Sequence, residues 1–318
     1  MKSAKRKPKQ LFRQLVMINF LRKITPLFLL NYYHLLLAFL GALIYGFPSR
    51  KMIIIGVTGT KGKSTVVEFC HRIFQEVGFK VASLSSIRFK INDEEQPNRL
   101  KMTMPGRFKI QRFLKKAVKV KCKYAILEVT SEGILQNRHR FINFDAAVFT
   151  NLSPEHIERH GSFERYREAK GKLFQSAKNI HIINIDDENA EYFLQLPAKK
   201  KYTYGLDKGD INSKDVQFKL QLIGEFNIYN ALAAISVGQA YGVGLAICKR
   251  ALEEIEGIPG RMEIVIKEPF KVIVDYAHIP DSLENVYQTL KTKDQKLICV
   301  LGSAGGGRDK WKRPKMGE

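Results

Sequence analysis

The most constraining feature of the sequence is a glycine-rich turn, GVTGTKGKST at residues 56–65. The apolar run Met52–Ile55 precedes it, and residues 66–79 (VVEFCHRIFQEVGF) follow with a helix-like pattern. A turn between a strand and a helix can hold phosphate groups, because backbone N–H groups and the N-terminus of the helix point into it. The strict P-loop requires Gly, four residues and then Gly-Lys-Ser/Thr. Here Gly62-Lys63-Ser64 fits the end of that pattern, but Val57 occupies the position of the first glycine.

The glycines of this turn lie instead at positions 56, 59 and 62. In a P-loop the lysine neutralises the β- and γ-phosphates, and the following Ser or Thr offers its hydroxyl to Mg²⁺. Lys63 and Ser64 would have these roles here. The alternative is a tight turn without a ligand. Because strand, glycines, Lys-Ser and helix occur in the required order, the sequence predicts a nucleotide-binding loop of variant spacing.

After residue 48 the chain alternates between apolar runs and helix-like patterns. Residues 51–57 (KMIIIGV) are apolar at successive positions, which is typical of a parallel strand buried on both faces. This alternation predicts an α/β fold, with a P-loop-type, mostly parallel central sheet and helices on both faces. Further strands are expected at 80–86, 124–131, 145–152 and 181–186, helices at 63–77, 107–119, 163–178 and 224–243, another helix ending near 256, and a hairpin or loop at 88–104.

A new pattern begins near residues 257–261 (GIPGR). Strands are expected at 270–277 and 296–304, on either side of a helix at 282–291, as at the start of a Rossmann-like domain. Such a domain needs more strands than remain before Glu318, so the sequence predicts an incomplete C-terminal domain, as a natural truncation or a fragment. The expected division is a basic tail with an apolar helical segment at 1–48, a central nucleotide-binding domain at 49–262, and the incomplete domain at 263–318.

The formal net charge of +22 on 318 residues favours anionic partners such as nucleic acids, phosphorylated metabolites or acidic membranes. A nucleic-acid-binding protein gathers its positive charges into a stripe with interleaved aromatic residues. Outside the N-terminal tail, Lys and Arg are scattered, so we expect no nucleic-acid partner. The four cysteines (70, 122, 248 and 299) lie far apart and indicate neither a zinc site nor a disulfide framework. Reduced thiols in the cytoplasm are the favoured interpretation.

The N-terminal segment combines positive charge with an apolar run. Residues 1–23 contain eight Lys or Arg and no acidic residue, and residues 26–47 carry no formal charge. The run is close to the ~20 residues that a membrane span needs. It could span a membrane, lie on its surface or pack on the following domain. We favour the second and third arrangements, because a single span would place the phosphate loop outside the cell and would bury Asn31 and His34 in lipid. The first of these two favoured arrangements would place residues 26–47 against the inner face of the plasma membrane.

Four further residues carry side chains that chemistry could use. Glu128 lies at the end of the apolar run YAILEV, at the sheet edge where ligands of open α/β folds bind, so it is either a Mg²⁺ ligand or a structural carboxylate. His156 and His160 are four residues apart and could form a zinc pair, but no third ligand is evident. Lys170, within an expected helix, would ordinarily be a solvated lysine.

Taken together in their order, eight segments resemble the Mur ligases, the ATP-dependent amide ligases of peptidoglycan synthesis, and among them the MurE type. The resemblance covers residues 48–318, and the family's own phosphate loop, GxxGTxGK[ST], explains the shifted glycines. The segments are GVTGTKGKST, EVTSEG, AVFTNLSPEHIERHG, YREAKGKLF, FNIYNALAA, GIPGRME, VDYAHIPDSLE and GSAGGGRDKWKRPKMGE.

The resemblance implies ATP bound between the central and C-terminal domains, two Mg²⁺ ions, and a CO₂-derived carbamate on Lys170. It also implies catalytic roles for Lys63, Lys170, His156 and Glu128, and metal binding by Ser64, Glu128, His156 and Lys170. Nucleotide contacts are implied for Gly59, Thr60, Lys61, Gly62, Lys63, Ser64, Thr65, Asn227, Asn230, Arg261 and Asp275, and contacts to the muramoyl peptide for Thr103, Ser131, Gln136 and Arg138.

The implied reaction activates a carboxylate by transfer of the ATP γ-phosphoryl group. The acyl phosphate is then attacked by the amine of an amino acid, diaminopimelate or lysine, which extends UDP-MurNAc-L-Ala-D-Glu. We expect a monomer. Two features depart from the family: residues 1–48 replace its uridine-binding domain, and the chain ends before the Asn-Pro-Arg loop that reads the amino acid.

These departures leave alternatives to a complete MurE-type enzyme. One is a Mur-like subunit that amidates a lipid-linked peptidoglycan precursor at the membrane, although the usual four-cysteine zinc module is not indicated here. Another is an ATP-binding fragment without complete ligase activity. Folylpolyglutamate synthase is a further relative that fits the motifs NLSPEHIERHG and YREAKGKLF less well.

Overall fold

A computed structural model describes residues 26–100, 102–291, 296–302 and 312–317 of the chain. Its main element is a nine-stranded sheet with the order β4-β3-β2-β5-β1-β6-β7-β8-β9. The strands are β1 (Ile53–Thr58), β2 (Val81–Leu84), β3 (Arg88–Ile91), β4 (Glu94–Pro97), β5 (Tyr124–Glu128), β6 (Phe144–Phe149), β7 (Ile180–Asn184), β8 (Lys200–Gly205) and β9 (Ile211–Asn212).

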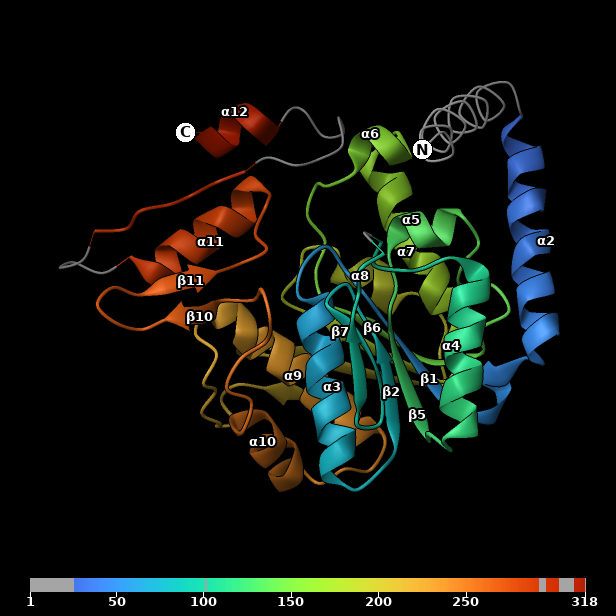
Figure 1. The fold of residues 1–318 in the computed structure, drawn as a ribbon, viewed down its shortest axis with the longest axis horizontal. Helices are drawn as coiled ribbons and strands as arrows, with labels where there is room; N and C mark the ends of the chain where they lie inside the picture. The colour runs from blue at the N-terminus through green and yellow to red at the C-terminus, as the bar shows by residue number, and fades with distance from the viewer. Residues whose placement is uncertain (1–25, 101, 292–295, 303–311, 318) are drawn as a thin grey trace, which may run out of the picture.

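Helices cover both faces of this sheet, and a smaller C-terminal unit follows it (Figure 1). The helices are α2 (Leu27–Tyr45), the 3-10 helix η1 (Pro48–Lys51), α3 (Lys63–Glu76), α4 (Arg107–Lys119), α5 (Ser131–Leu135), α6 (Ile157–His160), α7 (Phe163–Ser176), α8 (Ala190–Leu194), α9 (Glu225–Ala240), α10 (Leu245–Glu253), α11 (Pro280–Leu290) and α12 (Lys312–Gly317).

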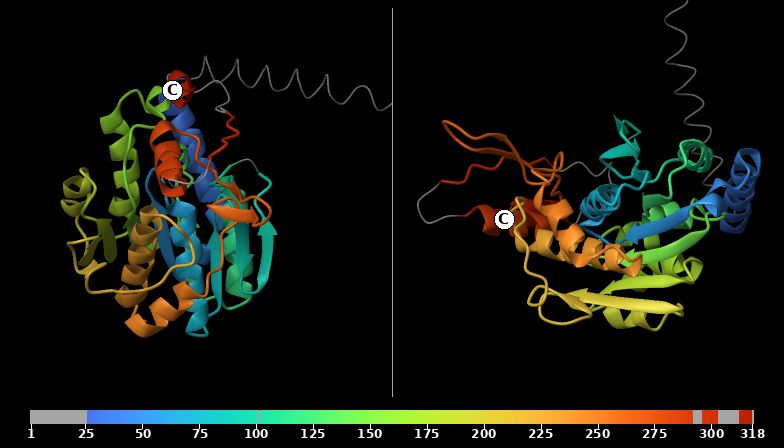
Figure 2. Two further views of the ribbon diagram at one scale, coloured as in Figure 1. Left: turned by 90° about the vertical axis from the view of Figure 1, so that its left-hand side faces the viewer. Right: turned by 90° about the horizontal axis from the view of Figure 1, so that it is seen from below.

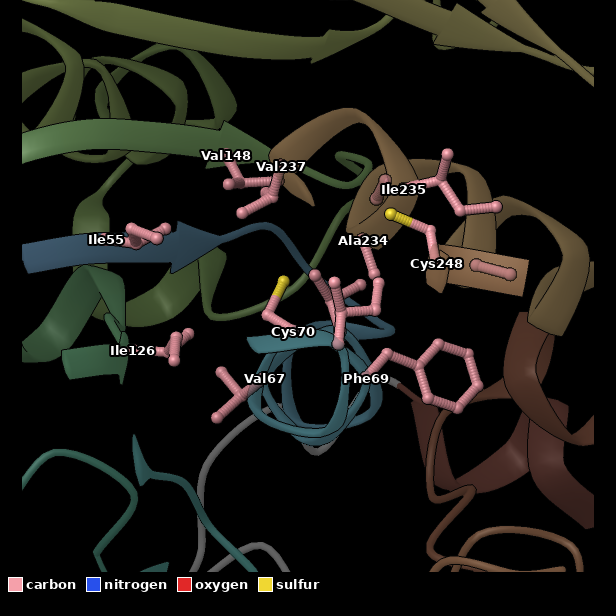
Figure 3. Close-up of a cluster of buried hydrophobic side chains, with 14 of the residues drawn as sticks. Ile55, Val67, Phe69, Cys70, Ile126, Val148, Ala234, Ile235, Val237 and Cys248 are labelled. Atoms are coloured by element: carbon pink, nitrogen blue, oxygen red, sulfur yellow. The ribbon is translucent and has the colours of Figure 1, made fainter. Parts of the chain in front are cut away.

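The strand β1 lies at the centre because its residues are apolar on both faces. It pairs in parallel with β5 on one side and β6 on the other. Ile55 and Val57 contribute to one hydrophobic core with α3, α9 and α10, and Figure 3 shows part of this cluster around Cys70. Ile54 contributes to the second core, on the face covered by α4, α7 and α8. The predicted α/β fold with a mostly parallel sheet is confirmed.

The edges of the sheet differ from its centre. The expected hairpin at 88–104 is present as the antiparallel pair β3–β4, which continues the sheet beyond β2. At the opposite edge β8 and β9 extend the parallel part, and the sequence analysis did not predict either strand. The residues of β8, KKYTYG, are partly exposed and do not alternate regularly between buried and exposed positions. They therefore lack the continuous apolar run that identified the central strands.

The apolar segment at the N-terminus forms one helix, α2, which packs along α4. By length and composition alone, Phe28–Tyr45 could cross a membrane, and 17% of this window is buried within the protein. Figures 1 and 2 show α2 at one side of the molecule, with the C-terminal unit at the other.

The C-terminal unit contains the antiparallel pair β10 (Glu263–Ile266) and β11 (Val272–Val274), followed by α11. The strand expected at 270–277 is therefore present in shortened form. The strand expected at 296–304 is not formed in its described part, residues 296–302, where no described strand pairs with it and the side chains are exposed. Residues 303–304 lie outside the described chain.

One buried histidine gives the sheet unit a pH dependence. The side chain of His71 in α3 is 1% exposed, and neither ring nitrogen has a hydrogen-bond partner among the described residues. Burial, reinforced by the positive charge of Lys90, lowers the pKa of His71 to about 3, although the charge of Glu68 opposes this. The unfolded chain therefore takes up the proton near pH 6.5, before the folded protein does.

We expect the free energy of unfolding to fall as the pH drops from about 6.5 towards 3, because protonation of His71 favours the unfolded chain. The His71→Leu variant should lose about 2–3 kcal/mol less between pH 7 and 4.5 than the parent protein. Urea unfolding at both pH values measures this. Phe69→Leu, a change to a buried neighbour without a proton to bind, should lower stability equally at both. An identical loss in the parent and His71→Leu proteins would contradict the assignment.

Candidate active site

The phosphate loop adopts backbone conformations that require glycine at two positions. Gly59 has φ +151° and Gly62, which precedes the first residue of α3, has φ +79°. A Cβ atom at Gly59 would lie 1.9 Å from Oγ1 of Thr150, and one at Gly62 would lie 2.2 Å from Oδ1 of Asn230. The glycines identified in the sequence are thus fixed by close approach of β6 and α9 as well as by backbone strain.

The end of β6 holds this loop in place. The backbone N–H of Thr60 donates to the carbonyl of Asn151 at 2.8 Å, and the N–H of Lys61 donates to the side-chain Oδ1 of Asn151 at 2.8 Å. Thr150 Oγ1 donates to the Lys61 carbonyl at 2.6 Å. Lys63 Nζ donates to the carbonyl of Thr60 at 2.7 Å, so its ammonium group lies against the loop.

Glu128 lies at the carboxyl end of β5, beside the first turn of α3. Its Oε2 accepts hydrogen bonds from Ser64 Oγ at 2.9 Å and from the backbone N–H of Ser86 at 2.7 Å. Arg261, two residues before β10, donates to the same Ser64 oxygen at 3.3 Å. Glu128 is buried. Carboxylate and hydroxyl oxygens side by side form a donor set that suits Mg²⁺.

Lys170 is the most unusual charged residue of the site. Its side chain lies on α7 and is 2% exposed, which overturns the expectation of a solvated helix lysine. Nζ donates to the carbonyl of Gly59 at 2.6 Å and lies 4.5 Å from the ring centroid of Tyr166. Burial and the nearby charge of Lys63 lower the pKa of Lys170 well below its usual range, although Glu155 and Glu128 oppose this. The amine therefore favours its neutral, nucleophilic form.

The two histidines of the expected loop lie at the two ends of the short helix α6. His156 precedes α6 with φ +57°, and its Nε2 lies 3.8 Å from Oε1 of Glu155. His160 faces Ser131 instead, with 3.1 Å between Nε2 and Oγ. The two rings thus meet different polar partners, although both lie beside the ring of Tyr166. No cluster of three His, Cys, Asp or Glu side chains suited to a metal is found in the described part of the chain. The arrangement does not favour a zinc pair.

Glu155 is a site residue that the sequence analysis missed. It is buried, and its Oε1 also lies 3.5 Å from Nε2 of His278 in the C-terminal unit. Burial would raise its pKa, but the hydrogen bond from His278 and the charges of His156 and Lys63 lower the pKa to about 2. The adjacent position of Glu155 and His156 in NLSPEHIERHG, and the His in VDYAHIPD, were the available signals.

The C-terminal unit also contacts the phosphate loop through an ion pair. Lys61 forms an ion pair of 2.7 Å with Asp281 at the start of α11. Arg261 lies over the ring of Tyr276, with its guanidinium 4.6 Å from the centroid. Both carboxylate oxygens of Asp275 accept backbone N–H groups, from Met262 and Ala277, which orders the turn after β11.

A cavity of about 490 Å³ opens between the two units, next to this contact. It contains three residues that sequence analysis assigned to ligand binding, Thr103, Arg261 and Asp275. The lining residues are Ser86, Ile87, Asn98, Met102, Thr103, Pro259, Gly260, Arg261, Val274, Asp275 and Tyr276.

The other expected substrate residues lie around α5. Ser131 is its first residue and meets His160. Gln136 follows the helix, and its Oε1 accepts a hydrogen bond from Arg138 Nη2 at 2.8 Å. Arg138 also donates to the carbonyl of Met104, one residue after Thr103. The structure thus connects these residues through the segment at 102–104.

The expected adenine contacts lie on α9. Asn230 Nδ2 donates to Oδ1 of Asn227 at 3.2 Å, and Asn227 Nδ2 donates to the carbonyl of Ile223 at 2.9 Å. The close approach of Asn230 to Gly62 places this pair directly beside the phosphate loop. Thr65, in the first turn of α3, is buried.

Comparison with known proteins gives a consistent result. The family described as Mur ligase middle domain matches residues 57–238, and the Mur ligase glutamate ligase domain matches residues 260–318. The UDP-N-acetylmuramoyl-L-alanyl-D-glutamate–2,6-diaminopimelate ligase of Bacillus velezensis is 36% identical over 310 residues, which cover 89% of this chain and 63% of that protein. The ligase of the same name from Syntrophomonas wolfei is 38% identical over 307 residues, which cover 89% of this chain and 62% of that protein.

Comparison with solved structures gives similar matches. A diaminopimelate ligase of the same name superposes with a TM-score of 0.66 and 30% identity, covering 84% of this chain and 59% of that chain. A folylpolyglutamate synthase of Mycobacterium tuberculosis, solved with ADP and AMPPCP, has a TM-score of 0.65 at 17% identity, covering 80% of this chain and 70% of that chain, which shows a common fold only.

The chain thus spans slightly less than two thirds of the length of these curated relatives. Mur ligases use ATP and Mg²⁺, and the phosphate loop, the Ser64–Glu128 contact and the buried Lys170 lie together at one edge of the sheet. On the match of both domains, with the middle domain alone matching residues 57–238, the chain belongs to the Mur ligase family.

Proposed function

We propose that this chain carries the ATP-dependent centre of a ligase that joins diaminopimelate to UDP-MurNAc-L-Ala-D-Glu through an acyl phosphate. The names of the relatives from Bacillus velezensis and Syntrophomonas wolfei support this substrate pair and favour diaminopimelate over lysine. The observation that carries the proposal is the burial of Lys170 against the phosphate loop, with Nζ 2.6 Å from the Gly59 carbonyl. A buried amine is costly to keep charged, and this position suits a site that modifies the lysine.

The modification proposed for Lys170 is carbamylation by CO₂. A neutral amine forms an N–C bond to the carbon of CO₂ and releases one proton, which turns a cationic side chain into an anion. The lowered pKa of Lys170 supports this step, because the neutral form is the nucleophile. Burial disfavours the carbamate anion as it disfavours the ammonium ion. Metal binding to the carbamate would offset this cost.

Two Mg²⁺ ions would be held by the donor groups gathered here, one by Ser64 and Glu128 and the other by His156 and the Lys170 carbamate. The ions supply neutralisation of the charge on the phosphoryl oxygens. Glu128 and Ser64 already lie 2.9 Å apart, which supports their common role. Glu155, adjacent to His156, would orient this imidazole.

Other residues of the site would bind ATP and neutralise the phosphoryl group during its transfer. The loop from Gly59 to Thr65 would bind the ATP phosphates through backbone N–H groups, and Lys63 and Arg261 would neutralise the phosphoryl group that moves to the carboxylate. Asn227 and Asn230 would contact the adenine. Each carboxylate oxygen of Asp275 accepts one backbone N–H and keeps a second lone pair. Asp275 would contact the ribose through these remaining lone pairs.

Substrate binding is proposed for Thr103, Ser131, Gln136 and Arg138. The cavity of about 490 Å³ includes Thr103, and the hydrogen bonds of Arg138 to Gln136 and the Met104 carbonyl connect the cavity to α5. Closure of the C-terminal unit over the loop would bring the acyl phosphate to the amine and exclude water. The division into domains at residues 48 and 262 is part of the proposal, as are a cytoplasmic location and a monomeric state.

A second candidate function is amidation of a lipid-linked precursor. One observation favours it: α2 contacts the substrate region, where Asn137 Nδ2 donates to Oδ1 of Asn31 at 2.6 Å. Asn137 lies between Gln136 and Arg138, so an apolar helix adjoins the residues proposed to bind the muramoyl peptide.

Phosphate release from ATP tests the proposed function. The protein should release phosphate when given UDP-MurNAc-L-Ala-D-Glu and meso-diaminopimelate, and less with lysine. Lys63→Ala should abolish release, because the phosphoryl charge loses its principal neutralising group. Release with a lipid-linked acceptor alone would select the second candidate, and none with any acceptor would contradict ligase activity of the chain.

Gly62→Ala should lower the affinity for ATP at least about tenfold, because the new methyl group meets Asn230 and displaces the loop. Calorimetric titration with ATP and Mg²⁺ measures the change. Gly242→Ala is the matched control: Gly242 has φ +81°, close to the +79° of Gly62, but no heavy atom lies within 4 Å of its added Cβ. Equal losses in both variants would show that backbone strain alone matters and would contradict the proposed role of the Gly62–Asn230 contact.

Lys170→Ala should lower ATP turnover by about 100-fold or more, since an anionic ligand near the phosphoryl group is lost. A short carboxylate such as formate should restore part of the activity. Lys172→Ala removes an exposed lysine two residues away on the same helix and should leave turnover unchanged. Full activity of Lys170→Ala would exclude the carbamate.

A further inference from the structure

The helix α2 has two different faces. Small residues, Ala38, Gly41 and Ala42, form a buried face against α4. A Cβ atom at Gly41 would lie only 3.6 Å from the backbone of Arg107 and Phe108 at the start of α4, so the two helices approach closely here. The hydrogen bond from Asn137 to Asn31 fixes the first half of α2 to the sheet unit.

The opposite face of α2 is composed of large apolar residues, and it stays exposed. Tyr32 and Ile44, three turns apart, are each 67% exposed, while Phe39, beside the rings of Phe47 and Phe141, is partly covered by these other described aromatic residues. We call it the α2 face. Its members are Phe28, Leu29, Tyr32, Tyr33, Leu36, Phe39, Leu43 and Ile44. A contiguous row of eight such side chains is unusual on a soluble surface and marks an interaction site.

The segments that flank the α2 face are positively charged. The chain contains no acidic residue before Glu68, and residues 98–127 contain ten Lys or Arg and no acidic residue. The exposed side chains of α4 include Lys109, Arg112 and Lys116. At the C-terminal end of α2, Lys115 Nζ lies 3.9 Å from the position of a Cβ on Gly46. An apolar row bordered by cations is the pattern of an interfacial helix on an anionic bilayer.

We propose that the α2 face docks onto an anionic lipid surface, with α2 lying in the plane of the interface. The row of apolar side chains would enter the boundary between headgroups and acyl chains, while the Lys and Arg side chains of α4 would meet lipid phosphates. Membrane crossing is disfavoured, because α2 is bound along its length to a domain whose neighbouring surface is charged. A second copy of the chain is a poorer occupant, since two proteins of charge +22 would repel each other.

This orientation leaves the active site accessible. The C-terminal unit lies on the other side of the molecule from α2 (Figures 1 and 2), so docking would not block its contact with the phosphate loop. Docking through the α2 face is compatible with either of the two acceptors proposed for the ligase.

Co-sedimentation of the full chain with vesicles tests the proposal. Binding is expected to vesicles with about 30% phosphatidylglycerol in phosphatidylcholine, and it should weaken strongly without the anionic lipid or in about 0.5 M salt. Leu36→Glu/Ile44→Glu should reduce binding about tenfold or more, because two carboxylates would enter the interface. Val265→Glu/Phe270→Glu is the matched control, since it places the same charges on exposed apolar positions of the C-terminal unit.

Three outcomes would overturn the proposal. If the α2 double variant binds as the parent does, the basic residues 1–23 alone account for binding. If both double variants lose binding equally, the effect is one of net charge. If sedimentation shows a dimer of the parent that the α2 variant loses, the α2 face is an interface between copies. Unchanged thermal melting of each variant ensures that folding is not the cause.

Discussion

The attachment of the phosphate loop to the end of β6 is the interaction on which the rest of the site depends. A loop of this kind exposes several backbone N–H and C=O groups, and here Thr150 and Asn151 accept or donate hydrogen bonds to those of Thr60 and Lys61. Since β1 and β6 are neighbours in a parallel sheet, their carboxyl ends already lie side by side. These hydrogen bonds fix the position of the loop, and the helices α3, α7 and α9 place Ser64, Lys170 and Asn230 around it.

Electrostatics then distinguishes the residues of this edge. Burial and the nearby charge of Lys63 both disfavour the ammonium form of Lys170. Glu155 experiences the opposite field, because His278, His156 and Lys63 surround it. The site thus combines an amine that tends to lose its proton with a carboxylate that remains ionised. This combination suits a centre that must bind anionic phosphates and metal ions in the same small volume.

The sequence predicted those parts of the fold whose signals are local. The run before Gly56 and the Lys-Ser pair after Gly62 identify strand, loop and helix within a single segment, and Glu128 is recognisable because it ends an apolar strand. Lys170 could not be distinguished from an ordinary helix lysine by its neighbours in the chain; only the resemblance to a family singled it out. Its burial depends on the packing of α7 against a loop more than 100 residues earlier. The Glu155–His278 contact was missed for the same reason, whereas the small residues Ala38, Gly41 and Ala42 at helical spacing did contain a signal for the packed face of α2.

The cavity between the two units has a thermodynamic consequence. Its walls come partly from the sheet unit, through Ser86 and Thr103, and partly from the C-terminal unit, through Asp275 and Tyr276. Any occupant that contacts both walls binds more tightly when the units are close together, and it must favour that arrangement to the same extent. The exposed pair Lys61–Asp281 is too weak to fix the distance by itself. Contact with both walls thus couples binding in the cavity to the separation of the two units, and the coupling acts equally in both directions.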